Sequence, residues 1–94
     1  MPRPKIPRRI SFEPNAIYFK PRGIPLFQLS EEELSYDEVE ALRLHDASGI
    51  NQIKCAKLME ISQPTFARIL ESARMKVAKA IVHGKAIKIS KLSK

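Results

Sequence analysis

Three polar residues near the start of one predicted helix have side chains suited to specific chemistry: Gln63, Thr65 and Arg68. A glutamine amide can form two hydrogen bonds with adenine, and an arginine guanidinium can form two with guanine. A threonine methyl group can contact that of thymine. Thr65 and Arg68 share one face of the helix because they are three residues apart. We therefore predict that these residues read base edges in double-stranded DNA.

A second set of residues, on this helix and the one before it, is predicted to contact the DNA backbone, where contacts set register without reading sequence. The set is Gln52, Lys54, Lys57, Ser72, Arg74, Lys76 and Lys79. The first nine residues hold three prolines and four basic side chains, which favours an extended arm. Its basic residues, Arg3, Lys5, Arg8 and Arg9, are candidates for the minor groove. The alternative is that the arm wraps the domain.

Residues typical of catalysis or metal binding form no constellation. His45 and His83 fall on different predicted helices, Cys55 lies in an apolar helix face, and no His/Cys cluster has metal-ligand spacing. The three glycines are isolated, so a glycine-rich phosphate loop is absent from the sequence. We expect neither enzymatic activity nor a metal or cofactor site.

Charge is distributed unevenly along the 94 residues, whose net charge is +7. Residues 1–22 carry six basic and one acidic side chain, residues 23–48 one and seven, and residues 49–94 ten and two. A positive arm and a positive C-terminal half are typical of a phosphate-binding surface. The acidic residues are interpreted as a solvated helix face that points away from DNA or toward a protein partner. They are Glu31, Glu32, Glu33, Asp37, Glu38 and Glu40.

The first predicted helix starts at Ser35, where Glu38 completes a capping box. It runs to about Ser48, and Gly49 can take the left-handed conformation that ends it. Asn51 is expected to cap the second helix. The apolar set of that second helix is Ile53 or Cys55 with Ala56 and Met59.

The third helix is predicted from Ser62 to about His83, because Ser62 can cap its first turn, Pro64 is tolerated there and Gly84 can close its end. An apolar stripe recurs at three- and four-residue steps: Phe66, Ile69, Leu70, Ala73, Val77, Ala80 and Ile81. About three residues separate the third helix from the second. Two helices joined so tightly form a helix-turn-helix, whose second helix enters the major groove.

Outside the helices the sequence predicts short extended segments. Residues 86–90 alternate like a strand, with residues 10–12 as the candidate partner in a ribbon within one chain or between two chains. Residues 16–19 are a further β-prone run, and residues 26–29 are expected to deliver apolar side chains to the core. The predicted organisation is a basic arm and connector over residues 1–25, then one helix-turn-helix domain over residues 26–94.

The single cysteine and the absence of a long apolar run from the sequence favour a cytoplasmic protein without membrane association.

Several segments spread over the chain resemble a small, largely uncharacterised prokaryotic family of predicted DNA-binding proteins. The helical half of that family is similar to the promoter-reading domain of sigma factors. The resemblance rests on residues 2–5, 8–9, 37–44, 62–74 and 84–86, and on the specific segment Tyr18-Phe19-Lys20-Pro21-Arg22-Gly23-Ile24-Pro25-Leu26. It implies an all-helical helix-turn-helix core and a DNA-binding role. Glu60 departs from the family pattern, because it stands where the turn usually has glycine. Ile53 and Lys54 replace acidic residues.

The sequence thus predicts a mainly α fold, a three-helix helix-turn-helix domain with an extended N-terminal arm and a short terminal β-ribbon. We expect sequence-specific binding to double-stranded DNA by a homodimeric transcriptional regulator. One alternative is RNA binding, although single-stranded RNA readers display exposed aromatic residues on their binding surfaces. The other is a protein-interaction adaptor that uses the acidic first helix.

Overall fold

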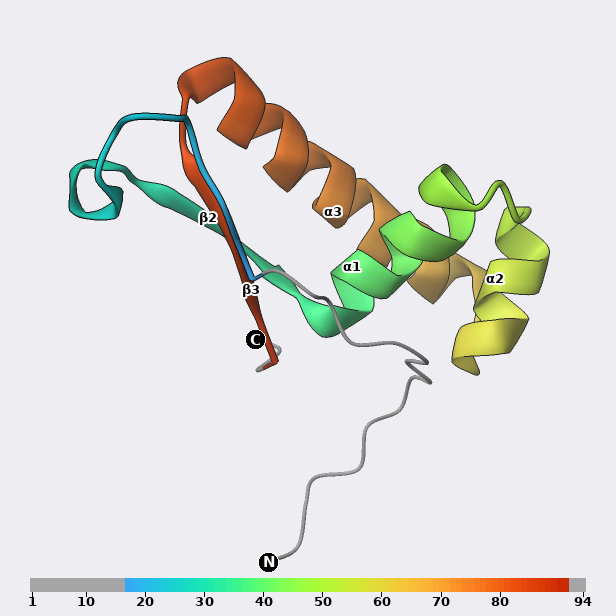
Figure 1. Ribbon diagram of the computed structural model, residues 1–94. Helices are drawn as coiled ribbons and strands as arrows, with labels where there is room; N and C mark the ends of the chain where they lie inside the picture. The colour runs from blue at the N-terminus through green and yellow to red at the C-terminus, as the bar shows by residue number, and fades with distance from the viewer. Residues whose placement is uncertain (1–16, 92–94) are drawn as a thin grey trace, which may run out of the picture.

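The computed structural model describes residues 17–91 (Figure 1). The predicted arm, with Arg3, Lys5, Arg8 and Arg9, and the predicted strand at residues 10–12 lie outside the described residues. The described part is mainly helical, with a small three-stranded sheet, which confirms the predicted fold class.

Besides one short 3-10 helix, the helical part of residues 17–91 consists of three α-helices and one π-helical segment. These are α1 (Tyr36–Ala41), the π-helical η2 (Leu42–Ala47) that directly continues it, α2 (Gln52–Met59) and α3 (Gln63–His83). The first predicted helix therefore has the expected extent, but its second half is a wider helix with bonds between residues five apart, such as the Ser48 N–H to the Arg43 carbonyl. Figure 1 shows α3 as the long helix against which both α1 and the sheet lie.

Side chains close the predicted helix ends. The Ser35 hydroxyl accepts from the Glu38 N–H while the Glu38 carboxylate accepts from the Ser35 N–H, which confirms the capping box. Asn51 accepts from the Lys54 N–H at 2.8 Å. Ser62 accepts from the Thr65 N–H at 3.2 Å, so all three predicted N-caps are confirmed.

The C-terminal stops are confirmed as well. Gly49 and Gly84 both have positive φ, 77° and 66°, a conformation in which a side chain would be strained.

The sheet consists of β1 (Tyr18–Phe19), β2 (Glu31–Ser35) and β3 (Ala86–Ser90) in the order β1-β3-β2. The predicted strand at residues 86–90 is confirmed, and β1 falls within the β-prone run at residues 16–19. The central strand β3 pairs antiparallel with β1 and parallel with β2. Because β1 pairs with β3, part of the segment predicted as arm and connector belongs to the folded unit.

The interpretation of the acidic residues as a solvated helix face is wrong. Glu31, Glu32 and Glu33 lie in β2, where Leu34 is buried and Glu32 pairs with Lys85 at 2.9 Å. The acidic residues of the first helix are buried rather than solvated, since the exposed fraction of each is 7% or less. They are Asp37, Glu38 and Glu40. A strand is stable here because the alternation places Leu34 in the core.

Residues 26–29 do not supply the core as expected. Leu26–Gln28 form a short 3-10 helix, η1, without a buried residue, and Phe27 is 85% exposed. The segment turns the chain from β1 toward the start of β2, with Phe27 on the outside of this connection and Leu26 and Leu29 half-buried.

The core has two clusters along one side of α3. The first joins α1, η2, α2 and the N-terminal half of α3, and contains Ala41, Leu44, Cys55, Ala56, Met59, Phe66, Ile69 and Leu70. The second joins the sheet to the middle of α3 and contains Leu34, Ala73 and Ile89. Cys55 rather than Ile53 faces the core of α2, because Cys55 is fully buried and Ile53 is 54% exposed.

The predicted apolar stripe of α3 is confirmed except at Ile81, which is 74% exposed. Ile81 lies 11 residues beyond the buried Leu70, about three helical turns, and therefore on nearly the same line along the helix. Leu70 belongs to the cluster that α2 helps to cover, whereas the cluster at the C-terminal half of α3 is closed by the sheet.

Phe66 should be the residue on which the first cluster depends most, because it is fully buried among residues of α1, η2 and α2. Phe66→Ala should lower the free energy of unfolding by about 3–5 kcal/mol, a large share of the stability of a small domain. Phe27→Ala, at an 85% exposed position, is the matched control and should leave the thermal midpoint nearly unchanged. Equal midpoints for the two variants would contradict this account of the core.

Candidate nucleic-acid interface

The link between α2 and α3 is a three-residue turn, residues 60–62. Glu60 adopts the left-handed conformation with φ 61° and ψ 44°, the geometry that glycine takes most easily. The strain of a non-glycine residue in this region is about 1 kcal/mol or more. The Ile61 N–H donates to the Ala56 carbonyl at 3.0 Å, and the Ile61 side chain packs against the first cluster. The short link thus holds the start of α3 beside α2.

The predicted base-reading residues lie together in the first two turns of α3. Gln63 and Arg68 are exposed, and Thr65 is half-buried. The Ser62 hydroxyl donates to Thr65 Oγ1 at 2.9 Å, and Arg68 Nη2 approaches the same oxygen at 3.4 Å. Thr65 therefore holds the Arg68 guanidinium near the first turn.

Backbone amides contribute little at this helix start. Pro64 has no N–H, and the Thr65 N–H is bonded to Ser62. Contacts with a phosphate or base at this end would consequently depend on side chains.

All three predicted backbone-contact residues of α2 are exposed: Gln52, Lys54 and Lys57. Within residues 17–91, neither lysine takes part in an ion pair. Their ammonium groups are therefore available to an anionic partner.

Two of the predicted backbone-contact residues on α3, Ser72 and Lys76, bond to other segments of the protein. The Ser72 hydroxyl donates to Glu38 Oε2 at 2.6 Å, and Lys76 Nζ lies 3.0 Å from Glu38 Oε1. Lys76 also donates to the Glu33 carbonyl at 2.7 Å, on β2. These contacts fix α3 to the start of α1 and to β2, so both residues have structural roles.

Glu38 is the centre of this group and is 7% exposed. Burial raises the pKa of its carboxyl group, but hydrogen bonds from Ser72 and the Ser35 N–H, together with Lys76, outweigh burial and leave the pKa below its ordinary value. The carboxylate is thereby held in its charged form.

Arg74, a third predicted backbone contact, pairs with Asp46 at the end of η2. Arg74 Nε donates to Asp46 Oδ2 at 3.0 Å, and a second guanidinium nitrogen contacts the other carboxylate oxygen. The hydrogen bonds from Arg74 hold the pKa of Asp46 below its ordinary value. Lys79, by contrast, is exposed farther along α3.

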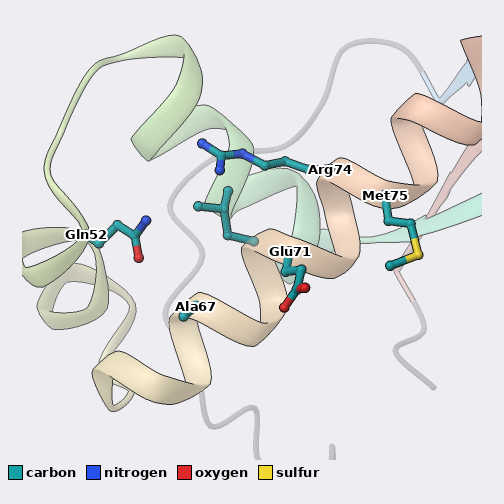
Figure 2. A pocket seen from close by; sticks show the side chains of 6 residues that line it. Gln52, Ala67, Glu71, Arg74 and Met75 are labelled. Atoms are coloured by element: carbon teal, nitrogen blue, oxygen red, sulfur yellow. The ribbon is translucent and has the colours of Figure 1, made fainter.

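An open depression of about 510 Å³ lies between the start of α2 and the middle of α3. Its lining consists of Gln52, Ala67, Leu70, Glu71, Arg74 and Met75. Figure 2 shows Gln52 on one side and Ala67, Glu71 and Met75 on successive turns of α3 on the other. The sequence did not indicate this depression, because it depends on how α2 packs against α3.

The structure thus gathers Gln63, Thr65 and Arg68 at one end of α3, close to α2 and its two exposed lysines. Sequence reasoning missed the internal partners Glu38 and Asp46, which are 28 or more residues from the α3 residues that they bind. No motif signals such distant pairs. Among residues 17–91 no group of three or more His, Cys, Asp or Glu side chains could hold a metal ion. In the same part of the chain, none of the helices is both apolar enough and long enough to cross a membrane.

A family model described as "Protein of unknown function DUF134" matches residues 1–91. The chain belongs to this family. Its DUF134 relatives include the UPF0251 protein of Moorella thermoacetica, 54% identical over 89 residues, which cover 95% of this chain and 60% of the relative. A UPF0251 protein of Caldanaerobacter subterraneus is 53% identical over 89 residues, which cover 95% of this chain and 75% of that protein.

The chain therefore spans between about three fifths and three quarters of these two relatives. No solved structure matches the chain. The predicted membership of a prokaryotic family without an assigned activity is confirmed.

The contacts of Glu38 predict a defined acid sensitivity of this DUF134 protein. Because the pKa of Glu38 is lower in the folded than in the unfolded chain, its stabilising contribution is present above about pH 4.5 and is lost as the pH falls through the folded value. Glu38→Gln should lose about 1–3 kcal/mol of unfolding free energy at neutral pH. Below about pH 4.5 the difference from the parent should shrink.

The measurement is urea unfolding at a series of pH values. Glu31→Gln, which changes an exposed carboxylate on β2, is the control and should unfold like the parent at neutral pH. A Glu38→Gln variant with parental stability at neutral pH would remove Glu38 from this role.

Proposed function

We propose that this protein binds double-stranded DNA in a sequence-specific manner, and that it acts in the cytoplasm as a homodimeric transcriptional regulator. The observation that carries the proposal is the exposed group at the start of α3, Gln63 and Arg68 with Thr65, held beside the exposed Lys54 and Lys57 of α2. This is the arrangement of reading and positioning residues that a helix-turn-helix requires. The likeness of the helical half to the promoter-reading domain of sigma factors belongs to the same proposal.

In this proposal the N-terminal end of α3 enters the major groove. Arg68 is directed to guanine and Gln63 to adenine, because each side chain can form two hydrogen bonds with those bases. The contact between Arg68 and Thr65 limits the positions of the guanidinium before DNA arrives. Less side-chain freedom is then lost on binding.

Lys54 and Lys57 contact phosphates and set the register of α3 in the groove. Arg74 and Lys76 do not belong to this surface, because each already pairs with a carboxylate of the same chain, Arg74 with Asp46 and Lys76 with Glu38. Lys54, Lys57 and Arg68 then supply the positive charge of this surface.

Two alternatives have less support. RNA binding would be favoured by aromatic side chains on the basic helices, but the exposed aromatic residues Tyr18, Phe19 and Phe27 lie on β1 and η1. An adaptor that binds through an acidic first helix would need exposed carboxylates there. Asp37, Glu38 and Glu40 of α1 are buried.

Binding to duplex DNA should depend strongly on salt. If a dimer neutralises about six phosphates, the logarithm of the association constant should fall against the logarithm of salt concentration with a slope near −5. Fluorescence anisotropy with a labelled duplex at several salt concentrations measures this slope. A slope close to zero would show that Lys54, Lys57 and their neighbours do not meet phosphates.

The roles of Arg68 and Lys57 can be separated by substitution. A preferred site is first selected from fragments of the source genome. Arg68→Ala should then lose about 1–3 kcal/mol of binding free energy on that site and reduce the preference at one base pair. Lys57→Ala should weaken binding to all duplexes equally and reduce the salt slope by about one.

Competition titrations of the preferred site against a scrambled duplex measure both effects. Both substitutions are at exposed positions, so a thermal melt of each variant serves as the folding control. If Arg68→Ala weakened both duplexes equally, α3 would be a non-specific clamp. The regulator assignment would then give way to an architectural or RNA-binding role.

A further inference from the structure

The outer side of α3 changes character along its length. The N-terminal half presents Gln63, Arg68 and Glu71, whereas the C-terminal half presents an apolar surface formed by Met75, Ala78, Ile81 and Val82. Met75 is 50% exposed, and Ile81 and Val82 are each 74% exposed. We call these four residues the α3 apolar surface. Adjacent exposed apolar side chains of this kind mark interaction sites.

We propose that the α3 apolar surface binds the same surface of a second copy of this chain, with the two α3 helices antiparallel. The inference rests on the proposed function, since a homodimer is part of it, and adds the surface through which the two copies meet. Three properties of α3 favour a second copy as the occupant: shape, charge and length.

The shapes are complementary within a single α3 helix. Ile81 projects outward, and the open depression of about 510 Å³ is lined on α3 by the apolar side chains of Ala67, Leu70 and Met75 together with Glu71 and Arg74. Ile81 and Leu70 lie on nearly the same line of the helix. In an antiparallel pair with Arg74 of one copy opposite Ile81 of the other, each Ile81 reaches the depression of its partner. A two-fold axis produces the contact twice, as an isologous dimer requires.

Charge favours the same arrangement. The exposed carboxylate of Glu71 lies at one end of the surface, and the exposed Lys79 lies toward the other end. An antiparallel pairing brings the Glu71 end of one copy near the Lys79 end of the other. A parallel pairing would instead place like charges side by side. Arg74, also at the surface, is already neutralised by Asp46.

The length of α3 fits two adjacent turns of DNA. The two-fold axis of this pair passes near Ala78, and Thr65 lies about 19 Å from it along the helix at 1.5 Å per residue. The two reading ends are then about 38 Å apart for strictly antiparallel axes, and less when the helices cross at an angle. Half-sites one turn apart are about 34–36 Å from centre to centre.

The surface is small, because it uses about one face of two or three helical turns. Stable complexes bury about 800 Å² per partner. The dimer should therefore dissociate readily in free solution and become tighter when two half-sites hold both copies, through effective concentration.

The first experiment measures self-association without DNA, by sedimentation equilibrium over a wide range of protein concentrations. Ile81→Glu should weaken the dimer at least about tenfold, because it replaces the apolar contact with Ala67, Leu70 and Met75 of the partner by a carboxylate beside Glu71, which lines the same depression. Phe27→Glu changes a residue that is 85% exposed on η1, outside the surface, and should associate like the parent. A monomeric parent, or an unchanged Ile81→Glu dimer, would overturn the inference.

A charge exchange tests the antiparallel direction. Glu71→Lys should weaken the dimer severalfold, and Glu71→Lys combined with Lys79→Glu should restore it, because the two charges meet again across the axis. No restoration would contradict the antiparallel pairing.

The outcomes separate this inference from the proposed function, because the association is measured without nucleic acid. If the protein dimerised but did not bind duplex DNA, the inference about the α3 apolar surface would stand and the proposed regulatory function would be wrong. A monomer that binds duplex DNA would overturn only the surface.

Discussion

Everything in this structure depends on the packing of one side of α3. Phe66, Ile69 and Leu70 close the cluster formed with α1, η2 and α2, and Ala73 closes the cluster formed with the sheet. Without α3, neither α1, η2 and α2 nor the sheet would have an extensive core, so both groups fold against α3. Leu42, at the start of η2, packs against both clusters and joins them. The position of the start of α3 relative to α2, and hence of the candidate reading residues, follows from this packing.

Glu38 is the polar counterpart of that packing. It is buried, yet its carboxylate has three partners, which come from the helix cap, Ser72 and Lys76. Because a buried charge is stable only when its hydrogen-bonding partners are in place, it ties the segments that supply those partners to one arrangement. Here it fixes α3 against the start of α1 and against β2. Lys76 also bonds to the Glu33 carbonyl, so a lysine occupies an acceptor on an edge strand that could otherwise pair with another chain.

These internal contacts divide the basic residues of α3 into two groups. Arg74 and Lys76 serve the fold, whereas Arg68 and Lys79 remain exposed. The outer side of α3 is divided in turn, with a polar half beside α2 and an apolar half beyond it. One helix can thus present a reading end and an association surface without either covering the other, because they occupy different parts of its length.

The sequence by itself determined the features that depend on contacts within about four residues. The caps at Ser35, Asn51 and Ser62, the glycine stop at Gly84 and the stripe of α3 were all predictable, because caps and helical periodicity are local. The three-residue link between α2 and α3 was equally clear. The sequence placed Glu60 in this turn, but only the structure showed that its backbone takes the left-handed conformation, with φ 61°.

Only the tertiary structure determined how the strands pair and which charged side chains form ion pairs. Strand β2 pairs in parallel with β3, some 55 positions later in the sequence. Its three glutamates come just before a capping box, so the sequence groups them with the acidic residues of the helix that follows. The pairs Glu38–Lys76 and Asp46–Arg74 join residues 38 and 28 positions apart, so neither spacing nor periodicity could reveal them. Periodicity likewise identified the face of α3 but not how far its neighbours extend along it. Ile81 is exposed because the segments that bury Leu70, which include α2, do not cover α3 three turns later. How far they reach along α3 is set by residues distant in the sequence.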